Sequence, residues 1–550
     1  MTVEAALYAG VFGIALFLRL FRLGLVPLSE SEAAQAVAAL HGTVLPPGDS
    51  PSLYAINSLL LSIFSPSDAL VRIVPAVIGS TLVLLPALFR DAIGRWGALG
   101  ASLILALSPV ALAASRSLDG EVITVACVIV LVALVRRYQL TRDERDLIGA
   151  AVVLGVGLAS GTGMYTALLA LGASWIVLRV ALRDDTARGS PLVFPNRTKV
   201  IAVVVGAFVL AATGVLTKPS GLAAAGDVLM AWLGGFGAPS GSSAFDIIQV
   251  LAVYELLALI VGAIGAGRAL MRADRFGAWL GFAAIIGLSI IIVQPGRQPI
   301  DLLLPVALLA LLAGYAIQPW AEAQAKAALT VDGVIVAIGA AMSGVLILLL
   351  TSYLRNALQT AVQVQPNVFV LAMFIVLPGL IGLLLSTMYE VSAVLRGAAT
   401  LGLALLALGS FGAGWGATQV RVGDPHEIIW GQGTTSMDVR ALVMTAEQVA
   451  IRTQGHARTL PFRVEVDDSV VAWYFRDAQP PVEPAPGVVT LYGSPPQSGD
   501  AKYVGARFTL RGTWDALGLS SEAWLEWALF RTGGLDQPLT TQAVTVWQKK

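Results

Sequence analysis

Long apolar runs recur through the first three quarters of the chain, and many of them approach or exceed the roughly 18 residues that a helix needs to cross a bilayer. Only 13% of the 550 residues are charged, compared with about 25% in an ordinary soluble domain. The sequence therefore predicts an all-α polytopic membrane bundle with about 13 transmembrane helices. The predicted spans are 4–24, 68–90, 96–115, 121–137, 147–160, 163–182, 200–217, 247–267, 276–293, 301–317, 330–351, 367–387 and 397–416.

The composition excludes several classes of function. The formal net charge is +0, so nothing in the charge balance favours binding to nucleic acid. The single cysteine, Cys127, lies inside an apolar run, which leaves no intramolecular disulfide and no cysteine-based metal site. No group of acidic residues and histidines has the spacing of metal ligands, and no cofactor is predicted.

Basic residues in the short loops predict the orientation of the bundle, because such residues gather on the cytoplasmic side. They are concentrated in alternate loops, which hold Arg90 and Arg95; Arg136, Arg137, Arg142 and Arg145; Arg183, Arg188, Arg197 and Lys199; Arg268, Arg272 and Arg275; and Arg396. We therefore expect a protein of the plasma membrane with a cytoplasmic N-terminus and an uncleaved first span. The loop 25–67 and the C-terminus are expected on the outer side.

Two carboxylates, Glu30 and Glu32, stand just past the first predicted span, at the start of a short amphipathic helix that Ser29 or Ser31 can cap. Acidic side chains at the mouth of an apolar bundle are costly unless they act chemically or have a partner. A carboxylate in such a place can act as the general base for a hydroxyl group. The simpler alternative is that both are solvated acids that stabilise the helix N-terminus.

Two other predicted outer turns, 115–121 and 294–301, also carry charged residues. An arginine at such a turn can hold a phosphate group through paired hydrogen bonds. This pattern favours transfer of a group from a phosphate-bearing lipid whose tail lies between the helices. The candidate catalytic residues are Glu30, Glu32 and Asp119, and the candidate substrate-binding residues are Arg116, Glu121, Arg297, Lys218 and His41.

Most of these residues also have a structural interpretation. Arg116 and Asp119 are three positions apart and can form an ion pair at a helix end. Arg297 can extend toward the lipid headgroups, and Lys218 can be an anchor at the membrane interface. His41 precedes a glycine and can simply end a helix.

The composition changes after the last predicted span, because residues 418–550 are polar and contain no further span. A helix is expected over 438–454, and the segments PFRVEVD, VVTLYG and AKYVGARFTL have the pattern of strands. We expect a transmembrane domain over 1–417 and a soluble outer α/β domain over 418–550. The cluster Trp473-Tyr474-Phe475 is expected in the core of the outer domain, and the alternative is a platform for a sugar.

The order and sidedness of several motifs resemble the GT-C glycosyltransferases, the superfamily that contains the protein O-mannosyltransferases and the aminoarabinose transferase of lipid A. Ser31-Glu32-Ala33 is similar to the Asp-Glu-Ala stretch of their first outer loop. Other segments with similar motifs are 68–72, 115–119, 155–163 and 297–305. In the C-terminal domain, 470–477 and 524–531 resemble a bacterial and archaeal subgroup often labelled as flippase-activity-associated.

This resemblance implies an inverting glycosyltransferase that uses a polyprenyl-phosphate-linked sugar and a glycan, lipid or protein acceptor at the outer face of the membrane. It also implies that Glu32 or Glu30 deprotonates an acceptor hydroxyl, while Arg116 or Arg297 stabilises the leaving lipid phosphate. Asp119 would position the acceptor or Arg116. The outer loops would close over the site and exclude water, which would otherwise hydrolyse the donor.

The sequence also departs from the family pattern. Ser31 stands where the family has its catalytic aspartate, and a hydroxyl that stays protonated at neutral pH cannot replace a carboxylate base. Gly163 stands where lysine is usual, and Gln298 where tyrosine is usual. These departures favour a second hypothesis, in which the chain is a catalytically degenerate accessory or scaffold for the assembly or flipping of lipid-linked glycans. Secondary transport has less support, because no inverted hydropathy repeat is evident.

Overall fold

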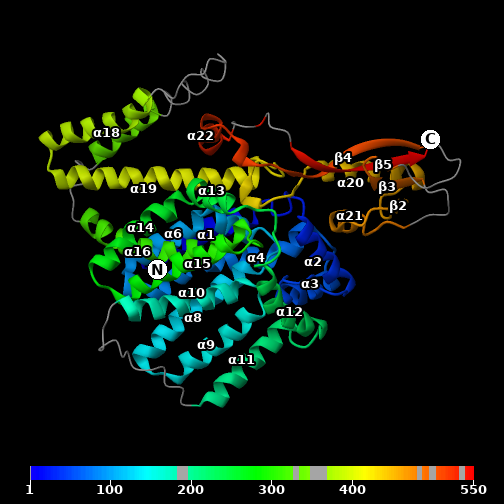
Figure 1. Ribbon diagram of the computed structural model, residues 1–550, viewed down its shortest axis with the longest axis horizontal. Helices are drawn as coiled ribbons and strands as arrows, with labels where there is room; N and C mark the ends of the chain where they lie inside the picture. The colour runs from blue at the N-terminus through cyan, green and yellow to red at the C-terminus, as the bar shows by residue number, and fades with distance from the viewer. Residues whose placement is uncertain are drawn as a thin grey trace.

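The computed structural model describes residues 2–181, 196–325, 333–346, 368–479, 486–494, 503–531, 535 and 539–549. A bundle of helices forms most of the molecule, and a small sheet with its own helices lies at one end of that bundle (Figure 1). The N-terminus lies on the side of the bundle away from the sheet (Figure 1). The helical bundle and the C-terminal α/β region confirm the predicted fold class.

Six of the described helices are long and apolar enough to cross a membrane, or up to eight if each of two bent pairs counts as one span. The predicted spans 330–351 and 367–387 lie partly outside the described residues, so the number of spans stays a prediction. The helices before the sheet region are α1 (Val3–Leu20), α2 (Glu30–His41), α3 (Pro51–Ile63), α4 (Asp68–Leu82), α5 (Arg90–Ile93), α6 (Arg95–Leu107), α7 (Pro109–Ser115), α8 (Glu121–Thr141), α9 (Glu144–Leu158), α10 (Gly163–Ala181), α11 (Arg197–Ala212), α12 (Ser220–Gly234), α13 (Ala244–Tyr254), α14 (Leu256–Met271), α15 (Arg275–Val293), α16 (Leu303–Ala325), α18 (Val368–Met388) and α19 (Val391–Trp415), with short 3-10 turns η1 (Leu85–Phe89) and η3 (Pro299–Leu302).

Two helix pairs are broken and bent: α6 meets α7 at 61°, and α13 meets α14 at 86°. Such breaks leave backbone N–H groups that need hydrogen-bond partners. Glu255, which is buried at the second break, accepts hydrogen bonds from the Ser108 hydroxyl at 2.6 Å and from the Val110 amide at 2.8 Å. Both donors belong to the first break, so one buried carboxylate joins the two.

Helices α2 and α3 form the loop predicted over 25–67, at the end of the bundle near the sheet (Figure 1). The Ser29 hydroxyl accepts a hydrogen bond from the Glu32 amide, and the Glu32 carboxylate accepts one from the Ser29 amide. These reciprocal bonds form a capping box, which fixes where α2 begins. Gly42 ends the helix in the left-handed conformation, with φ of 68°. The predicted short helix and its serine cap are confirmed.

The C-terminal region contains one mixed sheet of five strands in the order β1-β4-β5-β3-β2. Strand β2 runs parallel to β3, and the other neighbouring strands are antiparallel. The three predicted strands and the helix predicted over 438–454 are confirmed. The elements are β1 (Thr434–Thr435), α20 (Asp438–Gln454), β2 (Phe462–Val464), α21 (Ser469–Tyr474), β3 (Gly487–Leu491), β4 (Tyr503–Thr513), α22 (Ser521–Phe530) and β5 (Thr540–Lys549).

The sheet region and the loop 25–67 share one hydrophobic core. Buried residues of α2 and α3, such as Ala36 and Leu53, belong to the same cluster as Val439 of α20 and Trp473 of α21. Trp473, Tyr474 and Phe475 are all buried, which confirms their predicted place in the core. The first loop and the sheet region therefore depend on each other for burial of their apolar surface.

Asp68, at the start of α4, joins the sheet region to the bundle through three donors. Its carboxylate accepts hydrogen bonds from Trp473 Nε1 at 2.8 Å, from the Tyr474 hydroxyl at 2.6 Å and from the Arg440 guanidinium at 2.6 Å. The Tyr474 hydroxyl in turn accepts a hydrogen bond from the Leu28 amide at 3.1 Å. One carboxylate thus connects α20 and α21 with the residues that precede α2.

We expect Asp68→Asn to loosen this contact. The asparagine keeps one acceptor oxygen but turns the other into a donor. Either Trp473, which donates to Oδ1, or both Tyr474 and Arg440, which donate to Oδ2, then lose their acceptor, at a cost of about 1–3 kcal/mol for each donor. Hydrogen exchange of the detergent-solubilised protein should become faster in α21 and in the residues just before α2. The matched control is Asp477→Asn, because the Asp477 side chain is 64% exposed. Equal exchange in the two variants would contradict the role of Asp68.

Candidate active site

Polar segments that are far apart in the sequence meet around one cavity of about 240 Å³. They come from the loop 25–67, from the turns 115–121 and 294–301, and from the segment that joins α9 to α10. Its polar lining residues include Ser31, Gln35, Asp49, Ser50, Asp119, Glu121, Ser160, Thr162, Thr166, Trp232, Gln294, Gln298 and Asp301. Four of these carry carboxyl groups, and none of the described residues that line the cavity is a lysine, arginine or histidine.

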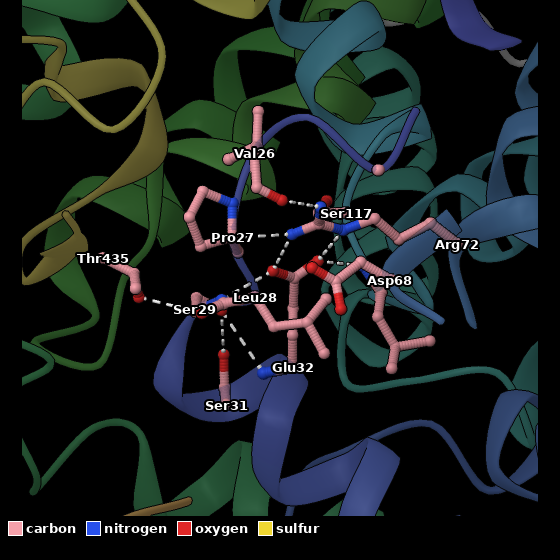
Figure 2. A network of polar contacts seen from close by, with 12 residues as sticks. Val26, Pro27, Leu28, Ser29, Ser31, Glu32, Asp68, Arg72, Ser117 and Thr435 are labelled. Carbon is pink, nitrogen blue, oxygen red and sulfur yellow. Dashed lines mark hydrogen bonds and ion pairs between the residues drawn. The ribbon is translucent and has the colours of Figure 1, made fainter. Parts of the chain in front are cut away.

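Glu32 is buried, and both of its carboxylate oxygens accept hydrogen bonds (Figure 2). Its two oxygens accept hydrogen bonds from Arg72 Nε at 2.8 Å and Arg72 Nη2 at 2.5 Å, from the Ser29 amide at 2.8 Å and from the Leu118 amide at 2.6 Å. Arg72 also donates to the carbonyl oxygens of Val26 and Pro27. The ion pair therefore holds together the segment before α2, the N-terminus of α2, helix α4 and the turn after α7.

The electrostatics of Glu32 do not suit a base. Burial alone would raise its pKa, but the Arg72 guanidinium and the hydrogen bonds from Arg72, Ser29 and Leu118 outweigh burial and lower the pKa below its usual value. A general base needs a free lone pair and a pKa near the working pH. Glu32 has neither, and it does not line the cavity, so the geometry supports a positioning role rather than the catalytic role expected from the sequence.

Glu30 and Ser31 point in different directions from the first turn of α2. The Glu30 side chain is 61% exposed and pairs with Arg511 of β4, which also pairs with Asp468. Glu30 is not among the lining residues, whereas Ser31 is. The position that resembles the family's catalytic aspartate thus faces the cavity, but it carries a hydroxyl.

Arg116 caps the C-terminus of α1. Its guanidinium donates to the carbonyl oxygens of Leu18, Arg19 and Phe21 through Nη1 and to that of Arg22 through Nη2, at 2.9–3.0 Å. It is only 1% exposed, and within the described residues no ion pair joins it to Asp119. Its hydrogen bonds are therefore committed to the end of a helix, and the geometry does not favour the expected contact with a lipid phosphate.

The other basic candidates lie outside the cavity lining. Arg297 donates to the carbonyl oxygens of Ile291 and Ser242 and so braces its own turn. The Lys218 ammonium lies beside the end of α2, where an added Cβ on Gly42 would be 3.9 Å from Nζ. His41 is exposed in the last turn of α2, as its structural interpretation expects.

Asp119 and Glu121 do line the cavity, at the turn that leads into α8. Asp119 Oδ1 accepts a hydrogen bond from the Glu121 amide at 2.7 Å. Burial raises the pKa of Asp119; the Glu121 hydrogen bond lowers it, and the nearby charge of Glu32 raises it further. Asp119 is therefore a carboxylate of enhanced basicity that faces a cavity.

Gly163 explains how Glu121 fits. A Cβ at residue 163 would lie 2.6 Å from Glu121 Cδ and closer still to Glu121 Oε2. The glycine, which stands where the family usually has lysine, thus leaves space that the carboxylate of Glu121 occupies.

Sequence reasoning did not single out two of the four cavity acids, Asp49 and Asp301. Asp301 was visible in the motif 297–305, and its carboxylate accepts a hydrogen bond from the Gln298 amide at 2.8 Å. Asp49 follows the turn-forming Pro46-Pro47-Gly48 in a loop already assigned to the site, which was the available signal. Burial and the neighbouring Asp119 raise the pKa of Asp49 to about 8.

Four carboxyl groups around a cavity raise the question of a metal ion. Within the part of the chain that the structure describes, no group of three or more His, Cys, Asp or Glu side chains is arranged so that it could hold one.

We expect Glu32→Gln to lower the free energy of unfolding by about 3–5 kcal/mol, because it leaves Arg72 buried without a counter-charge. Thermal unfolding of the purified protein in detergent measures this effect. Folding lowers the pKa of Glu32, so its contribution is complete well above the unfolded value of about 4.3 and is lost as the pH falls through the lower folded pKa. The difference between wild type and variant should therefore be full at pH 7 and shrink in acid.

The matched control for that experiment is Glu30→Gln in the same turn. Its ion pair is largely exposed on the glutamate side, so it should change stability by at most about 1 kcal/mol. If both variants have equally small effects, the Arg72–Glu32 pair is not the constraint inferred from its geometry.

A double-mutant cycle tests the relation between Gly163 and Glu121. Gly163→Ala should destabilise the protein by about 1–3 kcal/mol, because the new methyl group displaces the Glu121 carboxylate. Most of this loss should disappear in the background of Glu121→Ala, which empties the space. Additive effects of the two substitutions in thermal unfolding would contradict the proposed overlap.

Comparison with known proteins agrees with this architecture. Residues 48–194 match the family model of dolichyl-phosphate-mannose-protein mannosyltransferase. ArnT from Cupriavidus metallidurans bound to undecaprenyl phosphate superposes with a TM-score of 0.55 at 15% identity, over 86% of this chain and 84% of that one. Its apo state gives a TM-score of 0.52 at 14% identity over the same shares.

The archaeal oligosaccharyltransferase AglB from Archaeoglobus fulgidus, in complex with an inhibitory peptide and a dolichol-phosphate, is more distant. Its TM-score is 0.39 at 13% identity, over 74% of this chain and 56% of that one. Comparison with curated protein sequences found no match. The similarity to ArnT extends over most of both chains, and the chain described here therefore has a GT-C-like fold.

Proposed function

We propose that this protein is a membrane glycosyltransferase that transfers a sugar from a polyprenyl-phosphate donor to an acceptor hydroxyl at the outer face of the membrane. The observation that carries the proposal is the cavity beside α2, α8 and α10, which is lined by carboxyl groups in a bundle with the GT-C fold. ArnT, which has a similar fold, was crystallised with undecaprenyl phosphate. The match of residues 48–194 to a mannosyltransferase family model covers the turn that holds Asp119.

We assign the role of general base to Asp119. Of the three carboxylates that the sequence suggested as catalytic, Asp119 alone lines the cavity, although the sequence favoured Glu32 or Glu30 as the base. Glu32 is neutralised by Arg72, and Glu30 pairs with Arg511. Among the described residues none donates a hydrogen bond to the second oxygen of Asp119, Oδ2, and burial raises the pKa of this carboxyl group above its usual value, which makes it a stronger base.

In this mechanism the Asp119 carboxylate takes the proton of the acceptor hydroxyl as its oxygen attacks the anomeric carbon. The bond from the anomeric carbon to the phosphate oxygen breaks on the opposite side of the sugar ring, so the configuration inverts and the lipid phosphate leaves. The loop 25–67, held down by the outer domain, would exclude water that would otherwise hydrolyse the donor. Glu32 and Arg72 would keep that loop in place.

The orientation of the chain belongs to the same proposal. The basic residues of the short loops favour a cytoplasmic N-terminus in the plasma membrane, with the sheet domain outside. That arrangement places the cavity at the outer end of the bundle. The donor tail would lie between helices in lipid, and a glycan, lipid or protein acceptor would approach from the outer side.

Asp119→Asn should lower sugar transfer by about 10²–10⁴-fold, because an amide cannot take up the acceptor proton. The assay uses purified protein in nanodiscs with radiolabelled polyprenyl-phosphate sugars and a membrane extract as the source of acceptors. Asp227→Asn is the matched control, since Asp227 is an exposed acid on α12, one of the helices that line the cavity. Transfer that survives Asp119→Asn would remove Asp119 from the role of base.

A second candidate function is that of a non-catalytic accessory in the assembly or flipping of lipid-linked glycans. The observation that favours it is the acidic cavity, since no described lining residue is positively charged and Glu121 occupies the space beside Gly163. A phosphate group is usually held by arginine or lysine. Binding of a polyprenyl-phosphate sugar without transfer, unaffected by Asp119→Asn, would favour this alternative.

A further inference from the structure

Asp49 is a cavity acid to which neither the sequence nor the proposed mechanism gave a role. Its Oδ2 atom is buried and receives no hydrogen bond from any described residue. It lines the same cavity as Asp119. A buried polar atom without a hydrogen-bond partner lowers the free energy of unfolding by about 1–3 kcal/mol. The burial of Asp49 Oδ2 therefore needs an explanation, such as a function for this carboxyl group or a bound proton that removes its charge.

The backbone brings Asp49 against the turn of Asp119. An added Cβ on Gly120 would lie 2.8 Å from Ser50 Cβ and would also overlap the carbonyl oxygen of Ser160. Two residues after Ser50, the Ser52 amide donates a hydrogen bond to the carbonyl oxygen of Ala159 at 3.1 Å. Residues 49–50 therefore pass directly beside residues 119–120, and only a glycine at 120 permits this approach.

The surroundings of Asp49 are acidic. Asp119 from the turn after α7, Glu121 from α8 and Asp301 from η3 line the same cavity, and no described lining residue offers a cation. Two neighbouring carboxyl groups that are shielded from water do not both ionise, because the second negative charge is repelled by the first. The two acids differ in their hydrogen bonds: the Glu121 amide donates to Asp119 and favours its ionised form, whereas Asp49 Oδ2 receives no hydrogen bond from the described residues. Burial and the charge of Asp119 also raise the pKa of Asp49 to about 8, so we assign the proton to Asp49.

We propose that Asp49 and Asp119 act as an acid–base pair, in which Asp119 takes the proton of the acceptor hydroxyl and Asp49 gives its own proton to the leaving lipid phosphate. This inference rests on the proposed function and adds to it the group that assists departure of the phosphate. It also explains how an acidic cavity can accept a phosphate, since a carboxylic acid is a hydrogen-bond donor whereas a carboxylate is not.

The protons balance over one turnover. The pair begins with one proton on Asp49 and none on Asp119. The bond between the acceptor oxygen and the anomeric carbon forms, the bond between that carbon and the phosphate oxygen breaks, and the electron pair of the broken bond stays on the phosphate. Asp119 gains the acceptor proton and the phosphate gains the proton of Asp49. Transfer of the proton from Asp119 back to Asp49 restores the starting state.

The pH profile of transfer tests this pair in the whole protein in nanodiscs, with radiolabelled polyprenyl-phosphate sugar as donor. In the wild type, transfer should decline above about pH 8 as Asp49 loses its proton. Asp49→Asn should reduce transfer at pH 7 by about 10–100-fold and should also abolish the decline at high pH, because an amide does not titrate. A purely structural role would lower the rate at every pH and leave the shape of the profile unchanged, which would overturn the inference. Asp227→Asn is the control for both the rate and the profile.

An infrared measurement keeps the inference separate from the proposed function. The difference spectrum between wild type and Asp49→Asn at pH 7 should contain the C=O stretch of a protonated carboxyl group, which disappears with a midpoint near pH 8. Undecaprenyl phosphate should shift this band even if no sugar is transferred. A shifted band without transfer would support Asp49 as the group that donates a hydrogen bond to the phosphate, and it would count against the proposed glycosyltransferase activity. If the band is missing, or is not shifted by the lipid, the role of Asp49 is refuted even where transfer is observed.

Discussion

The buried ion pair between Arg72 and Glu32 is the interaction on which the arrangement of the site depends. Both partners are almost completely removed from solvent, and a pair of this kind is stable only when hydrogen bonds satisfy the remaining donors and acceptors. Here the backbone supplies them: the amides of Ser29 and Leu118 donate to Glu32, and the carbonyl oxygens of Val26 and Pro27 accept from Arg72. Because the pair and these groups belong to three separate segments, namely residues 26–32, helix α4 and the turn after α7, the pair fixes the first loop against α4 and the turn of Asp119.

The cavity beside this pair has an unusual charge for a site that would receive a phosphate. Its acids are not compensated by any described basic lining residue, and the basic residues nearby are engaged with backbone carbonyl groups, as Arg116 is at the end of α1. In such surroundings the ionisation of one carboxyl group suppresses that of the next. The charge of the cavity therefore depends on which of its carboxyl groups are protonated, and less on lysine or arginine side chains.

Sequence reasoning predicted the helical bundle, the α/β region, the capped helix at Ser29 and the meeting of the polar turns, because these follow from hydropathy, capping preferences and sidedness. It could not decide between Glu30, Glu32 and Asp119. That choice depends on Arg72, which lies 40 positions from Glu32 along the chain. Only the folded structure brings Arg72 of α4 beside Glu32 at the start of α2. Asp49 was missed for a similar reason. Its proposed role depends on the close approach of residues 49–50 to Gly120, which the local sequence does not predict.

The hydrogen bond from the Leu28 amide to the Tyr474 hydroxyl joins residues that are 446 positions apart. Closing so long a loop is a late event, since the ribosome must make most of the chain before the two ends can meet. Until then α2 and α3 lack the apolar partners that α20 and α21 supply. The order of biosynthesis therefore delays the packing of the first loop against the sheet region until the last quarter of the polypeptide has been made, and a nascent chain that has only its early helices does not yet hold the complete cavity.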